Sequence, residues 1–213
     1  MAFDEAQAAA QQDALRDVLT LVDWRRRVFE LYDDVRADPD PRQAWDHWRI
    51  VRDELFSSHA QSPVAPTNRD GHAGVYYDYD PRYRVTGEIV DAEQVGLDIA
   101  TSRWSTYRFT RFAQARLELQ GRRLVLDCFW LQGYGGGLFL PFADPTNGTT
   151  TYGGGRYLLD TLKGADLGVD DGKLVLDFNF AYNPSCAYDP RWICPLAPAG
   201  NRLPVPIEAG ERA

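Results

Sequence analysis

The first sixty residues carry apolar side chains at helical spacing, in steps of three or four residues or multiples of them. The positions are Leu15, Val18, Val22, Phe29, Tyr32 and Val35. Because the segment between Ala6 and Ala37 is also free of Gly and Pro, it predicts a helix from about Asp13 to Ala37. Asp40 and Pro41 then supply an N-cap and a first helical residue for a second helix, which runs to about Ser57. Residues 1–60 are therefore predicted to form a helical hairpin.

From Gly74 onward the pattern changes to short runs of β-branched and aromatic residues separated by turn residues. The runs are Val75–Tyr79, Tyr83–Val90, Val95–Thr101, Thr106–Phe112, Ala115–Gln120, Arg123–Trp130, Leu138–Phe142, Lys173–Phe180 and Val205–Ile207. No helical period long enough for a crossover helix separates them, and Gln120-Gly121-Arg122 predicts a tight hairpin. We expect a mostly β (α+β) fold, an antiparallel β-barrel or sandwich with an N-terminal helical hairpin.

The length of the chain limits how many cores it can build. At 213 residues, one core shared by the helical pair (1–60) and an antiparallel β domain (74–213) is expected. Prolines are frequent near the end, and they predict a stiff wrap across the β domain rather than further strands. These are Pro184, Pro190, Pro195, Pro198, Pro204 and Pro206.

Composition and charge exclude several classes of partner. The chain is 44% hydrophobic and 13% aromatic, which is typical of a folded, soluble protein. Its net charge of −8 repels a phosphate backbone, so we expect no nucleic-acid partner. No apolar run is long enough to span a membrane, and the acidic N-terminus lacks the apolar region of a secretory signal. We expect a cytoplasmic protein with no membrane partner and with reduced cysteines.

Candidate binding residues gather in the last third of the chain, beginning with the segment 151–157. Arg156 follows three glycines, where backbone N–H groups approach a ligand closely and a guanidinium can grip a carboxylate or phosphate. Tyr152 belongs to the same segment. Alternatively, Arg156 pairs internally with Asp144 or Asp177 and holds the loop in place.

A second group of candidates lies between residues 177 and 194. Alternation along the predicted strand Lys173–Phe180 places Asp177 and Asn179 on one face, with Asn183 and Cys186 in the loop that follows. One interpretation is that this face lines a cleft and that Asp177 has a catalytic role. The other is an ordinary polar row facing solvent.

Cys186 is a candidate nucleophile, although a thiol needs a base or a positive field to ionise at neutral pH. The histidines lie far back in the sequence, and a small buried side chain is the alternative. Cys186 and Cys194 are too few for a zinc site without borrowed ligands, so we expect no metal. The sequence does not identify a cofactor.

Several longer segments resemble the uncharacterised bacterial and archaeal family known as domain of unknown function sixteen eighty-four. They are His59–Pro63, Tyr77–Val85, Leu138–Asp144, Thr151–Tyr157, Leu176–Tyr188, Cys194–Leu196 and Glu208–Arg212. The resemblance covers roughly Trp45 to Arg212, and the extended first helix looks like an addition to the family's usual start. It implies no activity, because none is assigned to the family.

Three hypotheses follow. The leading one is a small-molecule binding domain whose anion-binding pocket is formed by the segments 151–157 and 177–194, with Arg156 on the ligand. The second is a hydrolase- or lyase-like enzyme in which Asp177 or Glu208 is a general base or Cys186 a nucleophile, with Arg156 orienting the substrate. The third is an interaction protein that docks through its N-terminal helices, which are also a candidate homodimer surface. A pocket or an enzyme requires the candidate residues to converge in one concavity.

Overall fold

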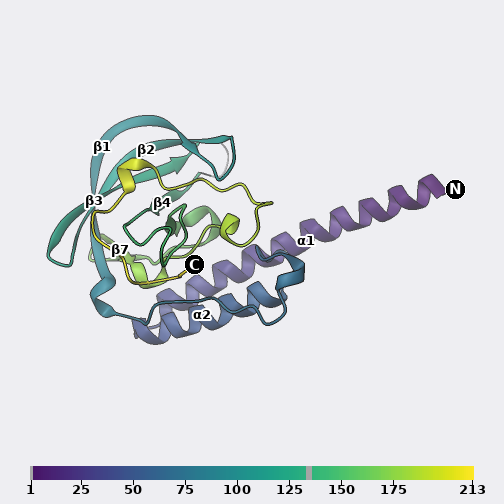
Figure 1. The fold of residues 1–213 in the computed structure, drawn as a ribbon, viewed down its shortest axis with the longest axis horizontal. Helices are drawn as coiled ribbons and strands as arrows, with labels where there is room; N and C mark the ends of the chain where they lie inside the picture. Colours follow the sequence, from purple (N-terminus) through teal and green to yellow (C-terminus); the bar gives the residue numbers. More distant parts are fainter. Residues whose placement is uncertain (1, 133–135) are drawn as a thin grey trace.

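Two long helices and a β-sheet make up the protein, seen in a computed structural model that describes residues 2–132 and 136–213 (Figure 1). Helix α1 spans Ala2–Ala37 and helix α2 spans Pro41–Ser58, and the two lie side by side as the predicted hairpin. The start of α2 is as expected: the Asp40 side chain accepts hydrogen bonds from the backbone of Arg42 and Gln43. Helix α1 begins well before the predicted Asp13.

The described residues form one seven-stranded sheet in the order β5-β4-β3-β2-β1-β7-β6, and every neighbouring pair is antiparallel. The strands are β1 (Arg84–Ala100), β2 (Thr106–Leu119), β3 (Arg122–Leu131), β4 (Leu138–Phe142), β5 (Arg156–Asp160), β6 (Val169–Asp170) and β7 (Lys173–Asp177). The mostly β, antiparallel class with an N-terminal helical pair is confirmed. Edge strands β5 and β6 do not pair in this part of the chain, so the sheet is open and the barrel alternative does not apply.

Strand boundaries differ from the sequence prediction in instructive ways. Four short strands were predicted between residues 83 and 120, and the structure has two long ones, β1 and β2. Bulges let each long strand continue through the point where a break was predicted. The predicted hairpin is present, with positive φ at both Gln120 and Gly121, as a type I′ turn requires. The run Val205–Ile207 does not form a strand: Val205 lies in a bend, and Pro204 and Pro206 cannot donate to a ladder. Strands β5 and β6 were not predicted.

One apolar cluster joins the helices to the sheet. Trp45 and Trp48 of α2 are almost fully buried and pack into the same cluster as Leu126, Phe142 and Phe178. The Trp45 indole also donates to the backbone carbonyl of Asn179, at 2.9 Å. Helix α2 is therefore part of the β domain's core rather than a separate appendage.

The N-terminal part of α1 extends beyond α2 and away from the sheet (Figure 1). Apolar side chains on this part remain mostly exposed: Leu15, Val18, Leu19 and Val22. The homodimer surface expected on these helices stays a prediction. No helix in the described ranges is both long and apolar enough to cross a membrane.

Candidate functional site

Arg156, the expected anion ligand, lies in the interior. The preceding Gly155 has φ 87°, and a Cβ there would lie 2.7 Å from the carbonyl oxygen of Phe142, so only glycine lets the chain enter β5 at this angle. The Arg156 side chain is completely buried. Its guanidinium donates to the Asp144 carboxylate at 3.1 Å and to the backbone carbonyls of Ile207, Ala209 and Glu211.

This geometry corrects the proposed role of Arg156. Burial lowers the pKa of the guanidinium, and the Asp144 carboxylate opposes that shift by favouring the charged form. With four acceptors inside the chain and no exposed surface, the side chain is placed to hold the C-terminal segment against β5 rather than to meet a ligand. The alternative of an internal pair with Asp144 describes the structure, and Asp177 is not its partner.

Asp177 and Asn179 do not share a strand face, because β7 ends at Asp177 and Phe178–Phe180 form a 3-10 helix. One Asp177 carboxylate oxygen caps this helix by accepting from the backbone N–H and the side-chain amide of Asn179, at 3.0 and 2.8 Å. The Asn179 amide also pairs with both backbone groups of Asp80. Both side chains are buried and tie loops together, so a catalytic role for Asp177 finds no support in its surroundings.

Burial raises the pKa of Asp177 above its ordinary value of 3.8, while its hydrogen bonds to Asn179 and the more distant Arg84 partly oppose that shift. A carboxyl with a raised folded-state pKa stabilises the fold at low pH, and this contribution is lost as pH rises from the ordinary value through the raised one. Asp177→Asn keeps the capping oxygen without the charge. We expect the stability of this variant relative to wild type to increase with pH over that window and then level off.

Urea unfolding of wild type and Asp177→Asn at a series of pH values from about 3 to 7 measures this difference. The exposed Asp170→Asn variant on neighbouring β6 is the matched control and should show no such trend. A difference for Asp177→Asn that stays constant across the series would contradict the prediction.

Glu208, the other candidate base, is exposed, whereas Glu211 three residues later is buried. The Glu211 carboxylate accepts from Arg52 of α2 at 2.9 Å, from the backbone of Asn183 at 2.8 Å and from the Tyr188 hydroxyl. Glu211 was not singled out from the sequence. Every second residue from Asn201 to Glu211 is buried. This period-two pattern includes Glu211 and does not include the exposed Glu208.

Tyr152 and Cys186 are partly exposed, whereas Asn183 is buried and its side-chain amide donates to the carbonyl of Arg212 at 2.8 Å. Tyr152 and Asn183 share the lining of a cavity of about 240 Å³. The Tyr152 hydroxyl lies 3.5 Å from the Cys186 sulfur, and the Cys186 backbone N–H donates to the Cys194 sulfur at 3.3 Å. Among the histidines, His59 is paired with Asp23 at 3.2 Å. The candidate residues therefore separate into an internal group and a group around the two cysteines.

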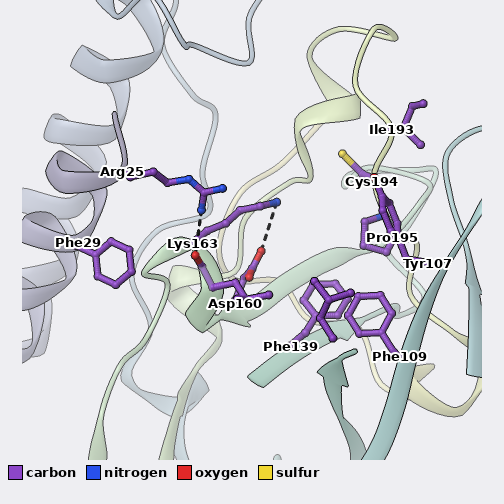
Figure 2. Close-up of a pocket in the computed structure, with 12 residues that line it drawn as sticks. Arg25, Phe29, Tyr107, Phe109, Phe139, Asp160, Lys163, Ile193, Cys194 and Pro195 are labelled. Atoms are coloured by element: carbon purple, nitrogen blue, oxygen red, sulfur yellow. Dashed lines mark hydrogen bonds and ion pairs between the residues drawn. The ribbon is translucent and has the colours of Figure 1, made fainter. Parts of the chain in front are cut away.

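A larger cavity of about 480 Å³ lies between α1, the sheet and the segment around Cys194 (Figure 2). Its apolar wall includes Phe109 and Phe139, which are stacked with 5.2 Å between their ring centroids. The cavity is also lined by Phe29 of α1, Tyr107 of β2, and Ile193, Cys194 and Pro195. One local signal for this cavity is present in the sequence: Tyr107 and Phe109 alternate along β2 and so face the same way.

Two basic side chains reach this cavity. Arg25 approaches from α1 and donates to the carbonyl of Leu162 at 3.0 Å, and the half-exposed Lys163 lies 3.4 Å from the Asp160 carboxylate (Figure 2). With two cations and one carboxylate among the lining residues, the cavity carries a net charge of +1. None of the sequence candidates named above supplies these cations.

In the described chain, no cluster of three or more His, Cys, Asp or Glu side chains has the arrangement of a metal site. The expectation of no metal stays a prediction.

The model of the family described as "Protein of unknown function (DUF1684)" matches residues 72–212. The chain belongs to this family. The DUF1684 match includes the sheet, both loop cysteines and Lys163, and it begins after α1 and α2. Arg25 and Phe29 therefore contribute to the cavity from outside the DUF1684 region.

This DUF1684 chain is similar to a solved structure, the solution NMR structure of the uncharacterized protein from gene locus rrnAC0354 of Haloarcula marismortui. The two chains are 38% identical, with a TM-score of 0.58, and the match covers 78% of this chain and 90% of the other. No curated protein matches the chain.

Proposed function

We propose that this protein binds a small amphipathic ligand, with an apolar body and one anionic group, in the cavity between α1, β2 and the Cys194 segment. The observation that carries the proposal is an apolar cavity of about 480 Å³ with two basic side chains at its lining. Its size is within the ~300–1,000 Å³ range of small-molecule sites, which are mostly apolar with a few placed polar groups.

The apolar wall supports binding of a hydrocarbon or aromatic body. Phe109 and Phe139 belong to an apolar cluster distinct from the main core, together with Tyr157 and the partly buried Leu131. Planar rings at the cavity wall favour stacking or edge contacts with a ligand ring, and each buried methylene of a ligand contributes about 0.8 kcal/mol.

The two cations support recognition of an anionic group. Arg25 donates one hydrogen bond to Leu162, which leaves further N–H groups of its planar guanidinium for a carboxylate or phosphate. Lys163 adds a second charge on a flexible stem, partly neutralised by Asp160. This arrangement replaces Arg156 as the basis of the binding hypothesis and moves the site from the 151–157 loop to the α1 side of the sheet.

Thermal unfolding with a graded set of ligands tests the proposal. We expect medium-chain and aromatic carboxylates to raise the Tm more than alcohols or amines of the same size. At ~100 times its dissociation constant, a ligand adds about 2.7 kcal/mol, which for a chain of this size is a rise of about 5–11 °C. Arg25→Gln should weaken carboxylate binding about tenfold or more, because a charge-assisted hydrogen bond is lost.

Arg26→Gln is the matched control, since Arg26 lies on the same helix but pairs with Asp23 and Glu30 in solvent. It should leave ligand binding unchanged. Equal shifts with carboxylates, alcohols and amines would contradict the anionic part of the proposal, and the absence of any shift across the set would contradict binding in this cavity.

A further inference from the structure

The loop between the last 3-10 helices brings two cysteines into contact. The Cys186 backbone N–H donates to the Cys194 sulfur at 3.3 Å, and both cysteines are free. The Tyr152 hydroxyl lies 3.5 Å from the Cys186 sulfur on another side. Cys186 therefore has a second thiol and a hydroxyl as immediate partners.

The surrounding chain holds this contact in place. The Cys194 backbone N–H donates to the Ser102 hydroxyl at 3.2 Å, and its carbonyl accepts from the Ser102 N–H at 2.9 Å. Within the loop, the Trp192 indole donates to the carbonyl of Pro63 at 2.9 Å, and the Arg191 guanidinium donates to that of Ser62 at 3.1 Å. Residues 191–194 are therefore anchored, which holds the Cys194 sulfur in place beside Cys186.

The two thiols differ in ways that divide the roles between them. Cys186 is partly exposed, and the hydrogen bond from Cys194, followed by that of Tyr152, lowers its pKa to about 6 against the opposing effect of burial. Cys194 is buried, and its hydrogen bond to Cys186 raises its pKa. Because the thiolate is the reactive form, Cys186 is the attacking thiol of the pair.

From this juxtaposition we propose that Cys186 and Cys194 form a redox-active dithiol, which a hydroperoxide converts to a reversible intramolecular disulfide. The proposal does not depend on ligand binding in the larger cavity. It concerns the oxidation state of the two sulfur atoms, which is measured directly.

The reaction takes place in two steps. In the first, the Cys186 thiolate attacks one oxygen of the hydroperoxide ROOH, the O–O bond breaks, and the alkoxide takes a proton and leaves as ROH, giving a Cys186 sulfenic acid. In the second, the Cys194 sulfur attacks the Cys186 sulfur, the S–O bond breaks, and water leaves with the proton of the Cys194 thiol. The sum is two thiols and ROOH to one disulfide, ROH and water. A low-molecular-weight thiol restores the dithiol by exchange.

Peptide mapping of the full chain after treatment with hydrogen peroxide tests the proposal. The protein is denatured with an alkylating agent after treatment, and the linked peptides are identified by mass. We expect a Cys186–Cys194 disulfide that dithiothreitol removes, with Cys128 alkylated as a free thiol. Cys128→Ser is the matched control and should behave as wild type, because Cys128 is completely buried and burial raises its pKa to about 12.

Two variants separate the roles. Cys194→Ser keeps an acceptor for the Cys186 N–H and should trap a Cys186 sulfenic acid that dimedone labels. Cys186→Ser should lose peroxide reactivity under the same conditions. If wild-type Cys186 remains a thiol under excess peroxide, oxidises to sulfinic acid without a disulfide, or links to Cys128 or a second chain, the proposal is overturned.

Tyr152 is a positioning residue in this proposal, and the pH profile of alkylation tests its role. We expect native-state alkylation of Cys186 by iodoacetamide to follow a midpoint near pH 6, set by the lowered pKa of its thiol. Tyr152→Phe removes a hydrogen bond to the thiolate and should move the midpoint upward. An unchanged midpoint in this variant would remove Tyr152 from the site, and a wild-type midpoint at or above pH 9, the ordinary value for this thiol, would overturn the assignment of Cys186 as the attacking thiol.

Discussion

Replacing Arg156 with alanine is expected to lower the free energy of unfolding by about 3–5 kcal/mol, the usual cost of breaking a buried ion pair from one side. For a chain of this size the Tm should fall by about 6–20 °C. The variant leaves the Asp144 carboxylate buried, 1% exposed, without its counter-charge. It also leaves three backbone carbonyls of the segment 207–211 without their donor.

Denaturant unfolding of wild type, Arg156→Ala, Asp144→Ala and the double variant measures this loss and its coupling. We expect the double variant to lose much less than the sum of the single losses, because the second substitution removes the stranded partner. Arg202→Ala, at an exposed position before the same segment, is the control and should stay within about 0.5 kcal/mol of wild type. A stable Arg156→Ala protein that had lost only ligand binding would favour the anion-loop hypothesis instead.

Glu211→Gln should have the second large effect, a loss of about 3–5 kcal/mol in the free energy of unfolding. Glutamine preserves the shape of the side chain but not its charge, so the Arg52 guanidinium, whose side chain is 12% exposed, remains in the core without a counter-ion. The guanidinium packs over the rings of Phe56 and Tyr182, 4.2 and 5.2 Å from their centroids, which do not replace a carboxylate.

Glu208→Gln makes the same chemical change on the same segment at an exposed position, and it should leave stability within about 0.5 kcal/mol of wild type. Both variants are compared by urea unfolding at neutral pH. A Glu211→Gln protein as stable as Glu208→Gln would show that the Arg52–Glu211 pair contributes nothing net to the fold.

Helix caps, turns and strands of this protein could be predicted wherever residue type and hydrophobic period alone determine them. The cap at Asp40, the I′ turn at Gln120 and most strand positions follow from residue type and period. The break expected after Val90 was wrong, because a bulge absorbs the irregularity and β1 continues. The end of β7 at Asp177 was missed, because the same hydrophobic alternation fits a strand that continues and one that turns into a 3-10 helix.

The candidate site was harder to predict because it depends on contacts between distant segments. The sequence identified Arg156 and its carboxylate partner Asp144, but the three backbone acceptors of Arg156 lie about fifty residues further along the chain. Arg25 and Lys163 line one cavity only after α1 packs beside the loop that follows β5, which no local period encodes. Cys186 and Cys194 were identified, and their contact was not, because it depends on how the loop between them is anchored to Pro63 and Ser102.

The hydrogen bonds of Arg156 and Glu211 set a limit on when the protein can finish folding. Acceptors for Arg156 and the counter-ion for Arg52 are supplied by residues 207–211, which follow the helices and all seven strands of the sheet in the chain. While these residues are still inside the ribosome, Arg156 on β5 lacks three of its four acceptors and Arg52 on α2 lacks its counter-ion. Both guanidinium groups are in positions that become buried. The domain therefore reaches its native packing only after residues 207–211 have emerged, and until then its exposed apolar surface needs protection from aggregation.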